Sequence, residues 1–153
     1  MLSDDVYKTR LRETTAAIEL WLSDLRPVAA IETARDEASW RVSVHPNVPD
    51  ACPFELVLRA DQQFDIAIGP ETYEDLPVGS LDQMLPLLRA IADGGVITRY
   101  WTTAATGTLA KVETIVGAAA SAWRQERVIA PLRRIDAGDL IARDCCYAPY
   151  ARG

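Results

Sequence analysis

The chain has 153 residues, of which 49% are hydrophobic and 25% are charged, and it carries a net charge of −6 with a pI near 4.8. This length and composition fit one globular domain with its own core and exclude a predominantly disordered chain. The acidic balance argues against nucleic-acid binding, because proteins that bind nucleic acid neutralise its phosphates with clustered Lys and Arg.

The start of the chain and its cysteines predict a cytoplasmic protein. The chain turns polar at Ser3-Asp4-Asp5 and lacks the basic start and apolar run of a signal peptide. No stretch reaches the roughly 18 apolar residues that a membrane span needs, so no membrane is expected as a partner. The cysteines, Cys52, Cys145 and Cys146, are odd in number and include an adjacent pair, which is not a disulfide framework. We therefore expect reduced thiols.

A first helix is predicted from Ser3 or Asp4 to Arg26. Its apolar residues recur at helical spacing, and Pro27 ends it because the residue before a proline avoids helical geometry. The residues of this face are Leu11, Ile18, Trp21, Leu22 and Leu25. Residues 28–37 are expected to be a connection.

Three strands follow at 40–45, 54–59 and 64–68, where apolar and polar residues alternate with the period of a half-buried strand. Only four residues separate the second and third strands, so the two are expected to form an antiparallel hairpin. Residues 71–78 are expected to be a loop.

A second helix is predicted from Ser80, which forms a capping box with Gln83, to the stop at Gly94-Gly95. Pro86 is expected to weaken or kink this helix. Strands follow at 96–102 and 109–116.

A third helix is predicted over 117–128. Residues 1–130 then form a single α+β domain, and residues 131–153 form a C-terminal arm or tail. The order α-β-β-β-α-β-β-α does not alternate strands and helices as doubly wound folds do. We therefore expect a five-stranded antiparallel sheet with helices against one face.

Charges on the last two strands indicate which face of the sheet is wet. Lys111 and Glu113 mark the outward face of one strand, and Arg99 marks that of the other. The candidate partner-binding residues on this outward face are Ile97, Arg99, Trp101, Leu109 and Ile115. Apolar anchors with a polar rim are typical of an interface, although the C-terminal arm covering this face would explain them as well.

The residue types that carry chemistry are sparse. His45 and Cys52 flank one loop, and a catalytic dyad also needs a third group and a basic surround; Asp50 is nearby, but the neighbourhood is not basic. The cysteines lack the paired spacing of a zinc site. Glu71, Glu74 and Asp75 share a loop without the ligand ladder of a calcium site, and we expect them to be solvated. The sequence thus favours a protein that is not an enzyme, with no catalytic residue, cofactor or metal.

The element order, length and acidity of residues 4–128 resemble those of the class I type III secretion chaperones and of the secretion-chaperone-like proteins of non-pathogenic bacteria. The resemblance implies a small bacterial domain that dimerises and has no enzyme activity. In that family the second helix and the next strand often build the dimer, which here implies Leu85 and Leu88 as dimer contacts. The long tail after Pro131, and Pro86 within the second helix, depart from the family pattern.

Two functional hypotheses follow. The first is a non-enzymatic, chaperone-like protein-binding module, homodimeric, that presents its sheet face to a protein partner. The alternative is a small-molecule-binding protein or enzyme with a pocket between the sheet and the first helix, lined by Trp21, Trp40 and Tyr100.

Overall fold

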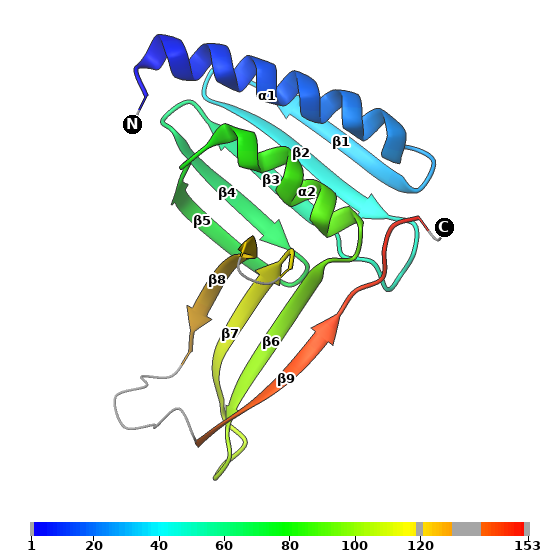
Figure 1. Cartoon of the computed structure of the whole chain (residues 1–153), viewed down its shortest axis with the longest axis vertical. Helices are drawn as coiled ribbons and strands as arrows, with labels where there is room; N and C mark the ends of the chain where they lie inside the picture. The colour runs from blue at the N-terminus through cyan, green and yellow to red at the C-terminus, as the bar shows by residue number, and fades with distance from the viewer. Residues whose placement is uncertain (1, 119–120, 130–138, 152–153) are drawn as a thin grey trace.

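The computed structural model describes residues 2–118, 121–129 and 139–151. Its first sheet is an antiparallel meander in which each strand pairs with the next along the chain, and it lies beneath the helices (Figure 1). The strands are β1 (Ala29–Arg35), β2 (Ser39–Pro46), β3 (Phe54–Arg59), β4 (Gln63–Ile68) and β5 (Glu71–Pro77). The α+β class and the five-stranded antiparallel sheet expected from the sequence are therefore confirmed.

One face of this sheet is the floor of the core. Alternate residues of β2, β3 and β4 are buried, which is the expected consequence of period-two patterning. Val42, Leu56 and Ile66 are opposed along the ladders and are at most 1% exposed. The other face of β2 and β3 carries half-buried and exposed residues such as Arg41 and Glu55, which pair with each other at 3.4 Å.

Two helices cover the core face (Figure 1). Helix α1 (Asp4–Leu25) buries Tyr7, Ile18 and Leu22 against the sheet. A short 3-10 turn, η1 (Leu81–Gln83), leads into α2 (Met84–Ala92). Because α2 begins only at Met84, Pro86 lies in its first turn, where backbone N–H groups have no intrahelical partner. The expected kink within a longer helix is thus avoided.

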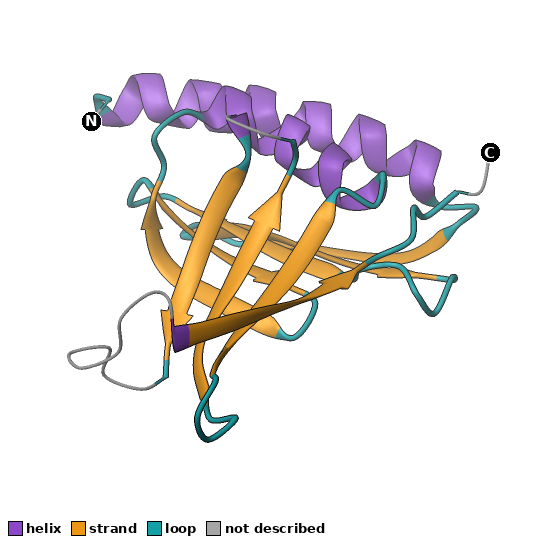
Figure 2. Ribbon diagram, turned by 60° about the horizontal axis from the view of Figure 1, so that its bottom comes forward, coloured by secondary structure: helices purple, strands orange, loops and turns teal. Residues whose placement is uncertain are grey.

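A second, four-stranded antiparallel sheet follows α2, in the order β8-β7-β6-β9 (Figure 2). Its strands are β6 (Val96–Thr103), β7 (Leu109–Val116), β8 (Trp123–Val128) and β9 (Leu140–Cys146). It joins the first sheet through β5. The Tyr73 and Thr114 hydroxyls lie 2.7 Å apart, and the Tyr73 ring meets Trp123 edge to face at 6.1 Å.

Three expectations about elements are wrong. Residues 29–35 and 71–77 are strands rather than a connection and a loop, and residues 123–128 are a strand rather than part of a third helix. In β8, pairing with β7 outweighs the helix propensity of its Arg, Gln and Glu residues. The strands on the two sides of α2 also form two sheets instead of one.

The described part of the C-terminal arm is integral to the fold. β9 pairs with β6 from Ile97 to Thr103, so it extends the second sheet at its edge instead of lying over its outward face. Tyr150 then packs into the core at 1% exposure, and its hydroxyl donates a hydrogen bond to the Cys52 carbonyl. The backbone N–H groups of Ala148 and Tyr150 donate to the carbonyls of Asp50 and Ala92. Residues 131–138, 152 and 153 of the expected arm lie outside the described residues.

Candidate binding surfaces

The predicted sidedness of the second sheet is confirmed by burial. Val96, Thr98, Val112 and Thr114 are buried on the inner face, and the outward residues of β6 are half-buried. Tyr100, which was also expected to point inward, is only half-buried. Among the candidate partner-binding residues, Ile97, Arg99, Trp101 and Leu109 retain exposed surface. Ile115 is only 5% exposed, between its ladder neighbours on β6 and β8, and it offers little surface to a partner.

Trp101 is held at the centre of this outward face. The Arg99 guanidinium lies 5.9 Å from the centre of its ring and the Lys111 amine 5.3 Å, which are cation–π distances. The indole N–H lies 3.4 Å from a Glu113 carboxylate oxygen. These contacts fix the orientation of an aromatic side chain that stays partly exposed.

The charged residues around Trp101 pair with one another across all four strands. Arg99 donates two hydrogen bonds to Asp144 on β9, at 2.7 and 3.0 Å. These bonds raise the pKa of the guanidinium and lower the pKa of the carboxyl. Lys111 pairs with Glu126 at 3.3 Å, and Arg124 pairs with Glu113 at 3.5 Å. Exposed pairs such as these add little stability, but they form a polar rim around the indole.

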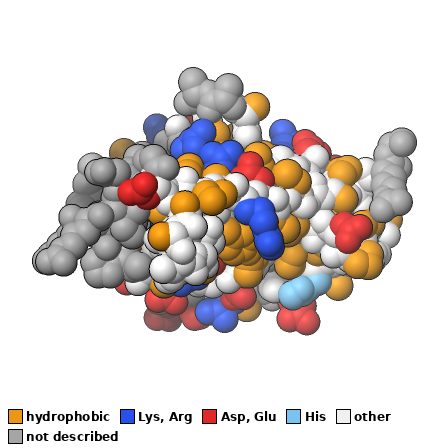
Figure 3. Space-filling view, turned by 90° about the horizontal axis from the view of Figure 1, so that it is seen from below, with side chains coloured by type: hydrophobic (Ala, Val, Ile, Leu, Met, Phe, Trp, Pro, Cys, Tyr) orange, Lys and Arg blue, Asp and Glu red, His pale blue; other side chains and the backbone are white. Residues whose placement is uncertain are grey.

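The end of the molecule formed by the second sheet shows hydrophobic side chains among Lys, Arg, Asp and Glu (Figure 3). On the outward face, Val128 lies opposite Lys111 and is 53% exposed. Trp101, Lys111 and Val128 therefore form one row across the outward face, which ends in an exposed apolar side chain at the β8 edge.

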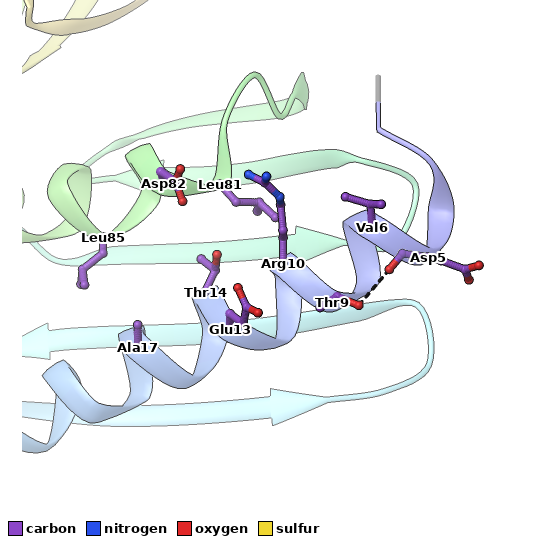
Figure 4. Close-up of a pocket in the computed structure, with 10 residues that line it drawn as sticks. All are labelled: Asp5, Val6, Thr9, Arg10, Glu13, Thr14, Ala17, Leu81, Asp82 and Leu85. Atoms are coloured by element: carbon purple, nitrogen blue, oxygen red, sulfur yellow. Dashed lines mark hydrogen bonds between the residues drawn. The ribbon is translucent and has the colours of Figure 1, made fainter.

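The groove between α1 and the η1–α2 segment, which we call the helix groove, is a second surface (Figure 4). It has a volume of about 690 Å³. Val6, Arg10 and Ala17 rise from α1, and Leu81, Asp82 and Leu85 lie across from them. Asp5, Arg10, Glu13 and Asp82 form no ion pair with any other described residue. The groove thus combines apolar walls with charges that remain available to a partner.

The two residues expected to contact a second copy are placed differently. Leu85 is half-buried and lines the helix groove. Leu88 is 0% exposed in the core of its own chain, so it has no surface to offer a second copy. α2 presents the face of Leu85, not that of Leu88, to the outside.

His45 and Cys52 do not form a catalytic pair. The His45 ring lies 3.3 Å from the Ser43 hydroxyl, and the Cys52 thiol donates to the Pro53 carbonyl. Cys52 is 0% exposed, and burial, with the nearby Cys145, raises the pKa of its thiol to about 12. The thiol is therefore protonated near neutral pH and is not a nucleophile.

This environment predicts selective thiol chemistry. In the folded protein at pH 8, iodoacetamide is expected to alkylate the exposed Cys145 and Cys146 and to leave Cys52 unmodified, because only a thiolate reacts. Peptide mass spectrometry before and after denaturation measures this. All three thiols should react in denaturant, and modification of Cys52 as fast as the other two in native buffer would contradict the burial.

Of the three carboxylates expected to be solvated, Glu74 and Asp75 are exposed, and only Glu71 differs from expectation. Glu71 is 4% exposed and accepts two hydrogen bonds from Arg127, at 2.8 and 2.9 Å, so it links the two sheets. Asp75 pairs with Arg59, as do Asp61 and Asp65. In the described parts of the chain, no three His, Cys, Asp or Glu residues come together as they would around a metal ion.

A cavity of about 380 Å³ lies between α1 and the β1–β2 hairpin. Of the three aromatic residues expected in such a pocket, only Trp40 lines it, and its indole N–H donates to Glu19 at 2.9 Å. Trp21 packs against the core, and Tyr100 lies on the second sheet. The expected aromatic pocket is therefore not assembled.

None of the helices in the described parts of the chain has the length and apolar character that crossing a membrane requires. No protein family, curated protein or solved structure matches this chain. The two surfaces described above are therefore the basis for a functional proposal.

Proposed function

We propose that the chain is a non-enzymatic, chaperone-like protein-binding module that acts as a homodimer and holds a protein partner on the outward face of the second sheet. The observation that supports this most is the setting of Trp101, an indole fixed by two cations and a carboxylate within a ring of ion pairs. Binding hot spots typically consist of a central Trp, Tyr or Arg surrounded by polar contacts that exclude water.

The chemistry of this face suggests the chemistry of the partner. The charges around Trp101 already pair with one another, so a partner with a high net charge of either sign gains little. A partner that inserts an apolar side chain against the indole, with uncharged polar groups beside it, removes apolar surface from water without breaking these ion pairs. We therefore expect a partner segment with an apolar anchor and little net charge.

Trp101→Ala is the test of this function. The immobilised wild-type chain is compared with the variant for capture of proteins from cells that produce it, and each captured protein is then purified and its affinity measured. A partner of the proposed face should bind the variant at least about tenfold more weakly, since loss of a hot-spot residue costs about 2 kcal/mol or more.

Ile141→Ala is the matched control. Ile141 is 56% exposed and lies opposite Thr102, on the other face of the same sheet, so its loss should leave binding unchanged. Trp101→Phe keeps an aromatic ring at this position, so it shows whether weaker binding by Trp101→Ala comes from loss of the indole or from a folding defect. Equal affinity of the wild type and Trp101→Ala for every captured protein would overturn the proposal.

A further inference from the structure

Helix α1 presents a second face besides the one it packs against the sheet. Val6, Arg10, Glu13 and Ala17 recur at spacings of three and four residues and are all exposed, so they form one stripe along the helix. All four line the helix groove, and Arg10 extends towards η1 (Figure 4). This stripe is not needed for the core, which uses Tyr7, Ile18 and Leu22.

The stripe is self-complementary. Its order along the helix is apolar, basic, acidic, apolar, so the reversed stripe carries the opposite charge at each inner position. When a second copy of α1 lies antiparallel, centred between residues 11 and 12, Arg10 of each copy faces Glu13 of the other. Val6 of each copy then faces Ala17 of the other. Such an arrangement has the reciprocal contacts of a two-fold symmetric interface.

Exposed apolar side chains at the two ends of α1 fit the same alignment. Leu20 is 75% exposed, Val6 is 44% exposed and Leu2 is 41% exposed. The antiparallel alignment brings Leu20 of one copy beside the Leu2 end of the other. The small side chain of Ala17 lets the two helices approach closely at the position facing Val6.

We propose that two copies of this chain pair through the α1 stripe, antiparallel, with the half-buried Leu85 of each helix groove against the helix of the other copy. This inference rests on the proposed homodimeric binding module and identifies its self-contact. Charge complementarity selects a second copy as the occupant, because Arg10 and Glu13 have no ionic partner among the described residues of their own chain.

Charge reversal tests the pairing. Sedimentation equilibrium is expected to show a wild-type dimer and dimers at least tenfold weaker for Arg10→Glu and for Glu13→Arg, because each single variant places like charges opposite one another. The double variant Arg10→Glu/Glu13→Arg restores the opposite charges and should dimerise like the wild type.

A mixture of the two single variants is the sharpest measurement. One copy with Glu at 10 and 13 faces one copy with Arg at both positions, so the mixture should form a heterodimer although each variant alone is repelled. Arg12→Glu makes the same charge change on another face of α1 and serves as the matched control, which should leave the dimer intact. Circular dichroism melts check that each variant is folded.

Three results would overturn the inference: a monomeric wild type at tens of micromolar, single variants that dimerise as well as the wild type, or a mixture that stays monomeric. If the wild type is monomeric and the Arg10→Glu variant no longer captures a protein that the wild type captures, the groove binds that protein and not a second copy. The Trp101→Ala comparison is read separately, so loss of the dimer with retained Trp101-dependent capture would remove this pairing and leave the sheet-face binding standing.

Discussion

Leu88→Ala is expected to lower the free energy of unfolding by about 2–5 kcal/mol. Leu88 is 0% exposed and belongs to the core cluster that joins α2 to the first sheet. Truncating it removes buried apolar atoms and leaves a cavity that a close-packed interior fills only in part. Urea denaturation followed by circular dichroism measures the loss.

Leu85→Ala provides the matched control, since it makes the same chemical change three residues earlier on the same helix. Leu85 is half-buried and lines the helix groove, so its truncation should cost about 1 kcal/mol in the isolated chain. The Leu88→Ala loss should be the same at every protein concentration if Leu88 acts within its own chain, whereas the Leu85→Ala loss should grow at concentrations where the proposed dimer forms. Equal losses, or a Leu88→Ala effect that vanishes on dilution, would contradict its placement in the core.

The central strands of the first sheet were predictable from the sequence because local pattern and tertiary burial agree there. Residues 40–45, 54–59 and 64–68 alternate cleanly, and their apolar residues on the core face are buried. The short connection at residues 60–63 correctly predicted the β3–β4 pairing. Gly94 likewise marked the end of α2, because glycine readily adopts the positive φ, here 84°, that commonly follows the last turn of a helix.

The edge strands could not be predicted because their residues are stabilised by pairing more than by burial. β1 buries only Ala29 and keeps Ile31 half-buried, so it has almost no alternation to detect. β8 has no fully buried residue and is rich in helix-forming side chains. Such strands depend on hydrogen bonds to an adjacent strand, and the pattern of a single sequence carries little information about which strands pair.

The binding surfaces were predictable to different degrees. Lys111, Glu113 and Arg99 correctly indicated the outward face, since a charge alternating with buried residues fixes the side of a strand. The ion pair of Arg99 with Asp144 was not predictable, because it depends on β9 joining β6. The helix groove was missed, although exposed Val6 and Leu20 beyond the core-facing stripe of α1 were a signal for it.

The backbone of the C-terminal segment packs closely against Gly94, so a substitution at this glycine is expected to have a large effect on stability. Gly94→Ala is expected to destabilise the protein by more than the about 1–2 kcal/mol that left-handed backbone geometry alone costs an alanine. A Cβ at Gly94 would lie 2.8 Å from the Pro149 backbone nitrogen and 3.0 Å from the Ala148 carbonyl carbon. Neither backbone atom can rotate away, so the segment carrying Tyr150 has to shift.

The stability loss in Gly94→Ala has two causes, backbone strain and the clash with the C-terminal segment, and Gly107→Ala separates them. Gly107 also has a positive φ, 67°, but a Cβ there would meet nothing within 4 Å, so its cost should be limited to backbone strain. The excess loss of Gly94→Ala over Gly107→Ala then measures how firmly the C-terminal segment is held. Displacement of Tyr150 should also uncover Cys52, so Gly94→Ala alone should make this thiol react with iodoacetamide under native conditions. Equal stability losses in the two variants, with Cys52 still protected in both, would show that the segment accommodates the methyl group and is not fixed by its contact with Gly94.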